Sequence, residues 1–423
     1  MNTNGKQELR NHAFLTSEGL EYRDGENWRV EPFKIKRGES LDSILTRLYR
    51  NNRVVWIRDE KVFKAVLKRF DEPITNFIEW RKADGNEKMK TYRNEAARGE
   101  FYLRAPKALD DWRIGDQSSE AIERAFTRFQ DTFRRSIFFS PGRTGLHVLE
   151  KICGDARKGD VLNMPRTSFH QTPFAENWPD LHWARDLTEG ETARAFIHAY
   201  DKNHAYVSSA NIKLGIGDYA REMNPAFHDV PGVWRVEVMD TGDAMLWDIT
   251  RGREWLHTPS VKLLRDLNIN HAIREAYIFE KSNPVMTQWY EDFAREFKAI
   301  DPTSDDDRIY RKLLKVVSLN AIGWLGSEEW ARDWMYRPDW HNAIITDAQA
   351  RMMRNAAKVR ELTGQAPFKC EVDCLYYVSD EENHIKAFPF LTDVNLSRAY
   401  KHAGTWRMDS DEGQRIAGLI EGA

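Results

Sequence analysis

The stretch Ala195-Phe-Ile-His-Ala-Tyr-Asp201-Lys-Asn-His-Ala-Tyr206-Val-Ser208 determines how the rest of the chain is interpreted. Its first part is an apolar run, which predicts a buried strand that ends at Asp201. A carboxylate at a strand end can hold a divalent cation, because the strand behind it fixes its position. The chain is then expected to turn into a short helix that contains Tyr206. Asp201 is therefore a candidate metal ligand.

A second pair of acids lies downstream, in Ala366-Pro-Phe-Lys-Cys-Glu371-Val-Asp373-Cys-Leu-Tyr-Tyr-Val378. This segment predicts two strands joined by a tight turn at Glu371-Val-Asp373. Two carboxylates at a hairpin tip project to the same side and repel each other, and a bound metal ion relieves that repulsion. An acidic hairpin taken alone is more often surface turn chemistry. Its position after two long predicted helices is what favours a site.

A helix with a basic stripe lies between these segments. Ser304-Asp-Asp-Asp307 has the form of a helix N-terminus, with a capping serine and acids in the first turn. The stripe that follows on one face consists of Arg308, Arg311, Lys312 and Lys315. Several aligned positive charges suit the oxygens of a triphosphate. A solvated surface face is the competing interpretation, and the stripe alone does not decide between them.

Periodicity and turn signals predict the other elements. Helices are expected at 59–70, 119–135, 146–152, 261–267, 285–300 and 347–362, and strands at 53–57, 232–239 and 276–279. Turns are expected at 140–145 and 214–218, and a loop or exposed hairpin at 85–99.

Composition limits the class of protein. The chain has 423 residues, 30% of them charged, and a net charge of -3, so any nucleic-acid binding must rest on a local basic surface. The 15 Trp and 21 Phe residues indicate ordered, packed domains. Neither a signal peptide nor an apolar run of membrane-spanning length is evident, and the three cysteines are expected to be buried thiols. We expect a cytoplasmic protein with no membrane partner.

The order of these segments resembles the palm and fingers of family B DNA polymerases, closest to the protein-primed type. The first palm motif of that family is Asp-x-x-Ser-Leu-Tyr-Pro-Ser. In this sequence it runs from Asp201 through Tyr206 to Ser208, with His204 at the serine position and Val207 at the proline position.

The two later motifs are also present in altered form. The fingers motif Lys-x-x-x-Asn-Ser-x-Tyr-Gly keeps its spacing from Lys315 to Gly323, with Asn320 at the serine position. The motif Tyr-x-Asp-Thr-Asp-Ser aligns without a gap, so that Asp373 matches the second aspartate and Glu371 replaces the first. The likeness covers residues 140–410 clearly and 40–140 faintly.

The resemblance implies a mixed α/β fold: a palm with a small antiparallel sheet, helical fingers and an N-terminal exonuclease-like domain. The implied domains are a degenerate exonuclease-like domain at 1–139, a connecting segment and first part of the palm at 140–258, fingers at 259–327 and a second part of the palm at 328–423. The thumb and its Lys-x-Tyr motif are not expected in this chain, which weakens the expected grip on DNA.

The implied reaction is nucleotidyl transfer, in which a primer 3′ hydroxyl attacks the α-phosphate of a nucleotide. The implied catalytic residues are Asp201, Asp373 and Glu371, with Asp201 and Asp373 holding two Mg²⁺ or Mn²⁺ ions. The implied nucleotide-binding residues are Tyr206, Arg308, Arg311, Lys312, Lys315 and Asn320. The implied partners are a DNA primer-template and dNTPs, with a place for a priming or processivity protein.

Two other functions remain open at this point: a catalytically inactive scaffold that binds DNA or a partner protein, and a primase or terminal-transferase-like enzyme. Nuclease activity is not expected. Asp24-Gly-Glu26 fits the Asp-x-Glu pattern of an exonuclease only in letters, because no apolar strand precedes it and glycine favours a turn.

Overall fold

The computed structural model describes residues 11–49, 54–67, 81–82, 89–94, 99–104, 106–138, 140–153, 172–176, 178–202, 204–239, 253–301, 303–328, 335–389, 391 and 406–408. The chain divides into two compact units. The first comprises residues 1–148 and 300–321, and the second comprises 149–299 and 322–423.

A seven-stranded sheet forms the centre of the first unit, in the order β3-β2-β1-β4-β7-β6-β5. Its strands are β1 (His12–Leu15), β2 (Leu20–Asp24), β3 (Asn27–Glu31), β4 (Val54–Ile57), β5 (Arg81–Lys82), β6 (Met89–Asn94) and β7 (Gly99–Arg104). Strand β4 pairs in parallel with β1 and β7, and the other pairs are antiparallel. All residues of β1 and β4 are buried, as expected for parallel strands covered on both faces.

Helices complete this unit. They are α1 (Leu41–Tyr49), α2 (Glu60–Leu67), the 3-10 helix η1 (Pro106–Trp112), α3 (Ser119–Phe133), and parts of α4 (Pro141–Cys153) and α11 (Asp305–Leu325). Two ion pairs tie α3 to the start of α11: Arg124 to Asp306 at 2.8 Å and Arg128 to Asp307 at 2.5 Å. The Arg128 guanidinium also lies over the Tyr310 ring, 4.0 Å from its centre. The acids at the start of α11 are therefore engaged by α3.

The segment Asp24-Gly-Glu26 is the turn between β2 and β3. Asp24 is paired across the turn with Asn27, and Gly25 has a φ of 62°, a left-handed conformation that glycine adopts without strain. The Asp24 carboxylate forms an exposed ion pair with Arg29 at 2.6 Å. The predicted turn is confirmed, and these acids stand on a surface hairpin.

Two antiparallel sheets form the second unit. The four-stranded sheet has the order β10-β13-β11-β12, and the five-stranded sheet has the order β16-β9-β15-β14-β8. The strands are β8 (His182–Ala184), β9 (Phe196–Lys202), β10 (Leu214–Met223), β11 (Gly232–Val238), β12 (Trp255–His257), β13 (His271–Asn283), β14 (Lys369–Glu371), β15 (Cys374–Ser379) and β16 (Trp406–Met408). The helices are η4 (Pro173–Ala175), α6 (Glu189–Thr192), α7 (Ala205–Ser209), α9 (Thr258–Asp266), α10 (Thr287–Ala299), α12 (Pro338–Thr363) and α13 (His384–Ala387).

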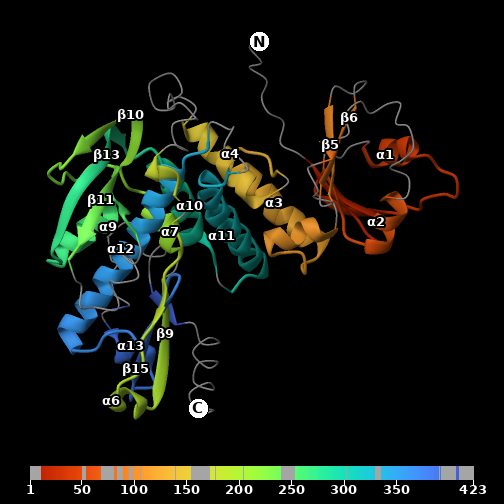
Figure 1. Cartoon of the computed structure of the whole chain (residues 1–423). Helices are drawn as coiled ribbons and strands as arrows, with labels where there is room; N and C mark the ends of the chain where they lie inside the picture. Colours follow the sequence, from red (N-terminus) through yellow and green to blue (C-terminus); the bar gives the residue numbers. More distant parts are fainter. Residues whose placement is uncertain are drawn as a thin grey trace. The chain divides into compact units, whose positions relative to one another are not determined.

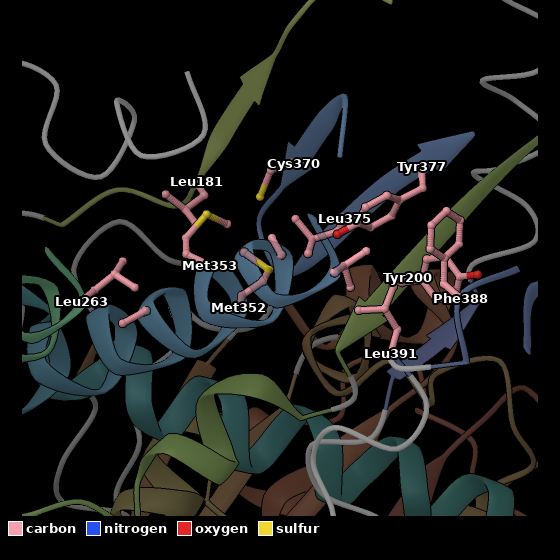
Figure 2. Packing of buried hydrophobic residues seen from close by; sticks show 13 residues of the cluster. Leu181, Tyr200, Leu263, Met352, Met353, Cys370, Leu375, Tyr377, Phe388 and Leu391 are labelled. Carbon is pink, nitrogen blue, oxygen red and sulfur yellow. The ribbon is translucent and has the colours of Figure 1, made fainter. Parts of the chain in front are cut away.

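Helix α12 runs past both sheets of this unit (Figure 1). Its side chains Met352 and Met353 pack with Tyr200 of β9 and with Leu375 and Tyr377 of β15, all of them buried. Figure 2 shows side chains of the helix and of the strands pointing toward one another. This apolar cluster holds the five-stranded sheet against α12.

The predicted fold class is confirmed: helices and antiparallel sheets are mixed. The predicted turn at 214–218 is wrong, because these residues belong to β10. Glycine at position 215 allows β10 to pack closely, because any side chain there would collide with the Phe279 ring. Its carbonyl accepts hydrogen bonds from Arg337 at 2.6 Å and from the Trp340 indole at 2.8 Å. Gly217, at a φ of 68°, lies where the β10–β13 register shifts.

The predicted turn at 140–145 is also wrong, because Pro141 already starts helix α4; proline is favoured in a first helical turn. The other predicted helices and strands are confirmed with shifted ends, as with the expected strand 276–279, which extends over the whole of β13. Of the expected loop or exposed hairpin at 85–99, residues 89–94 form β6, and residues 85–88 and 95–98 lie outside the described residues. The end of the predicted helix 59–70 lies outside the described residues. In the described part of the chain, no helix combines the length and the apolar character needed to cross a membrane.

The core cluster generates a stability prediction. Leu375 of β15 is fully buried in the cluster with β9 and α12, so Leu375→Ala should lower the free energy of unfolding by about 2–5 kcal/mol through lost burial and a residual cavity. The matched control is Leu362→Ala, because Leu362 is 51% exposed and the change should cost less than about 0.5 kcal/mol. Urea denaturation of both variants measures the difference, and equal effects would contradict the assigned core.

Candidate functional site

The pairing of β9 with β15 brings Asp201 beside the tip of the β14–β15 hairpin. Asp201 stands opposite Cys374, and the Lys202 N–H donates to the Asp373 carbonyl oxygen at 2.9 Å. Asp201 is only 8% exposed. The pairing thus brings Asp201 of β9 next to the turn that contains Asp373, although the two aspartates lie 172 positions apart in the sequence.

The hairpin tip contains a strained residue. Glu371 pairs with Cys374, which leaves Val372 and Asp373 as a two-residue turn. Val372 has a φ of 57°, a left-handed conformation that is unfavourable for a β-branched side chain. Its N–H donates to the Leu181 carbonyl oxygen at 2.7 Å, which helps to hold the tip in place. Strain of this kind is often found at functional sites.

Glu371 is engaged by a neighbouring cation. The Lys369 ammonium lies 2.6 Å from a Glu371 carboxylate oxygen, and the Tyr376 hydroxyl is 3.5 Å from the same oxygen. The side chain is about one-third exposed. Glu371 therefore carries a partly neutralised charge.

Tyr206 lies on α7, directly after the strand end. Its hydroxyl donates to the Asp180 carboxylate at 2.8 Å, and burial together with that carboxylate raises the pKa of the phenol, so that it stays protonated. His204, which precedes α7, is buried in a left-handed conformation, and its ring stacks on Phe297 with 3.8 Å between ring centres. These contacts fix the orientation of the short helix.

Lys202 adds a buried cation to this region, and only 1% of the residue is exposed. Burial lowers the pKa of its ammonium to about 8; Arg351 acts in the same direction, whereas Asp347 and Asp373 raise it. Asp347 and Arg351 form an ion pair on α12 at 2.7 Å. The predicted acidic centre therefore contains positive charge as well.

The predicted basic stripe lies on the part of α11 that belongs to the first unit. Arg308, Arg311 and Lys312 are exposed, and Lys315 is half-buried. Arg308 forms an ion pair with Asp305 in the preceding turn. The Asn320 amide donates to the Val316 carbonyl oxygen at 2.8 Å, within its own helix.

The structure thus assembles Asp201, Glu371, Asp373 and Tyr206 in the second unit, and the basic stripe with Asn320 in the first. A cavity of about 500 Å³ in the second unit is separate from the acidic centre. Its wall includes Asp347 and Arg351, but not the two aspartates or Tyr206.

The donor set fits a hard divalent cation. Carboxylate oxygens are the ligands that Mg²⁺ and Mn²⁺ prefer, and Mg²⁺ is often held by one or two carboxylates with water and phosphate oxygens completing its shell. Among the described residues, no group of three or more His, Cys, Asp or Glu side chains is placed to hold a metal ion. Asp201 and Asp373 therefore suit a cation whose remaining ligands come from water or substrate.

Sequence reasoning missed three residues of this region: Lys202, Asp180 and Arg351. Lys202 could have been noticed, because a lysine directly after a predicted buried strand end must be partly desolvated. No local sequence pattern indicates Asp180 or Arg351, because both come from segments of the chain other than those that carry Asp201 and Asp373.

Comparisons with known proteins give a fold. No protein-family model matches the chain, and no curated protein matches it in sequence. Among solved structures, Phi29 DNA polymerase in an orthorhombic crystal form is similar, with a TM-score of 0.55 and 10% identity over 95% of this chain and 83% of that one. Phi29 DNA polymerase complexed with primer-template DNA and incoming nucleotides has a TM-score of 0.58 and 11% identity, over 95% and 84%. The chain has a DNA-polymerase-like fold.

The strained tip generates a prediction that is independent of activity. Asparagine enters the left-handed region more readily than valine, so Val372→Asn should raise the free energy of unfolding by about 1 kcal/mol. The control is Val378→Asn in the buried part of β15, which should be destabilising by about 1–3 kcal/mol. Thermal denaturation distinguishes them, and a loss of stability in Val372→Asn would argue against strain at the tip.

Proposed function

We propose that this protein is a metal-dependent nucleotidyltransferase of the DNA polymerase type, which adds deoxynucleotides to the 3′ hydroxyl of a primer. The observation that carries the proposal is the pairing of β9 with β15, which places Asp201 beside Asp373 in a polymerase-like fold. The order of the three altered motifs of family B polymerases supports it. Two of the similar structures were solved with primer-template DNA, which supports DNA as the partner of this chain.

Asp201 and Asp373 are the proposed ligands for Mg²⁺ or Mn²⁺. When bound, such ions stabilise negative charge on the attacking and leaving oxygens of a phosphoryl transfer. Backbone hydrogen bonds hold the end of β9, which carries Asp201, against the hairpin tip that carries Asp373, and a rigid backbone favours a metal site. Glu371 has a weaker proposed role, because Lys369 already engages its carboxylate.

The remaining proposed roles concern the nucleotide. Tyr206 is proposed to place its ring against the incoming sugar, oriented by the hydrogen bond to Asp180. The exposed cations Arg311 and Lys312, together with Lys315 and Arg308, are proposed to attract the triphosphate. Asn320 is the weakest member of this set, because its amide bonds within its helix.

One observation favours the alternative of a catalytically inactive scaffold. Lys202 places a buried positive charge beside the proposed metal ligands, which opposes cation binding. A scaffold would keep the palm as a DNA- or protein-binding surface without turnover. Primer extension separates the two functions.

The metal ligands generate the main activity prediction. Asp201→Asn and Asp373→Asn should each reduce primer extension by at least about a hundredfold, because each removes an anion that holds the cation while conserving shape. Glu371→Gln should have a milder effect. The assay is extension of a labelled primer-template with dNTPs and Mg²⁺ or Mn²⁺.

Asp218→Asn is the matched control, since Asp218 is an exposed aspartate on β10 of the same unit and should leave activity unchanged. Wild-type incorporation that survives in both Asp201→Asn and Asp373→Asn would overturn the assignment of the ligands. Inactivity of the folded wild type with either metal would favour the scaffold.

Tyr206 generates a prediction about sugar selection. If its ring excludes a 2′ hydroxyl, the wild type should prefer dNTPs over rNTPs, and Tyr206→Ala should reduce that preference by at least about tenfold. Tyr206→Phe is the matched control, because it keeps the ring and removes only the hydrogen bond to Asp180. Competition between labelled dNTP and rNTP measures the ratio. Equal loss of preference in both variants would show that the hydrogen bond matters and not the ring.

A further inference from the structure

Lys202 is the least expected residue of the acidic centre. It follows Asp201 directly on β9, and its backbone N–H is bonded to the carbonyl oxygen of Asp373. With 1% of its surface exposed, its ammonium has little access to water. A buried lysine is costly unless nearby charges compensate for the lost hydration, so its position requires an explanation.

The charged groups that act on the Lys202 amine are Asp373 on the hairpin and Asp347 and Arg351 on α12. Asp347 and Arg351 form an ion pair with each other at 2.7 Å, so their charges largely cancel. Asp373, on the hairpin, is then the acidic group that acts on the ammonium from outside this ion pair. Lys202 thus adds a buried basic side chain directly after Asp201, one of the two proposed metal ligands.

We propose that Lys202 is a built-in cation that weakens divalent-metal binding at Asp201 and Asp373 until a ligand with additional negative charge arrives. The inference rests on the proposed function, because it assumes that these aspartates hold the metal. Lys202 is not assigned contact with the metal or the substrate. It acts through its charge on Asp373.

Electrostatics supports this role. A fixed positive charge repels a divalent cation twice as strongly as a monovalent one, and a site shielded from water screens that repulsion poorly. A triphosphate carries several negative charges and offsets the charge of the ammonium. Metal occupancy would therefore be coupled to nucleotide occupancy, since each ligand supplies charge that favours the other.

The test measures Mn²⁺ binding to the full chain without DNA or nucleotide. Electron paramagnetic resonance reports the concentration of free Mn²⁺ during the titration. Lys202→Met keeps the length of the side chain and removes its charge, so it should bind Mn²⁺ about tenfold more tightly than the wild type. Lys202→Arg keeps the charge and should remain within about threefold of the wild type. The control is Lys213→Met, because Lys213 is an exposed lysine of the same unit and should have no effect.

Asp373→Asn identifies the site, because it should abolish the tightened binding in a Lys202→Met background. Melting temperatures establish that the variants are folded. Unchanged or weaker Mn²⁺ binding in folded Lys202→Met would overturn the inference, as would equal tightening in Lys213→Met. Tighter binding without primer extension by any variant would support the inference while the proposed polymerase activity fails. Primer extension by the wild type, together with an unchanged Mn²⁺ affinity in Lys202→Met, would support the proposed polymerase activity and overturn the inference about Lys202.

Discussion

The antiparallel pairing of β9 with β15 is the constraint on which the candidate site depends. The register of this pair places Asp201 opposite Cys374. A hydrogen bond from the Lys202 N–H to the Asp373 carbonyl oxygen continues the pairing into the hairpin tip. Two aspartates repel each other, so a flexible chain would not bring Asp201 and Asp373 together. Backbone hydrogen bonds and the apolar cluster on α12 supply the free energy that holds them together.

Charge around this centre is more balanced than a pair of aspartates suggests. Lys202 compensates part of the charge of Asp373, and Lys369 engages Glu371. Arg351 is paired with Asp347 on the helix beside them. A site built in this way keeps carboxylates close together at a lower electrostatic cost. The same balance distinguishes it from a plain acidic cluster, whose repulsion only a bound cation relieves.

Local pattern predicted many elements well and failed where proline started a helix or where a glycine was required by packing. The helices expected at 119–135 and 347–362 were both predicted from periodicity, and they correspond to α3 and to most of α12. Gly215 instead reflects the Phe279 ring and the Arg337 and Trp340 donors, which come from later in the chain. Because a turn glycine and a packing glycine look alike in sequence, the strand β10 was missed.

The sequence by itself determined that Asp201 lies near the end of a strand, Asp373 at a hairpin tip and Tyr206 in a short helix, because periodicity and turn chemistry act over a few residues. Only the tertiary structure decided which groups meet there. Lys202 became a buried side chain whose backbone N–H bonds to Asp373, and Asp180 became the partner of Tyr206, through contacts between distant segments. Burial and pairing depend on the whole folded chain, and local patterns do not specify them.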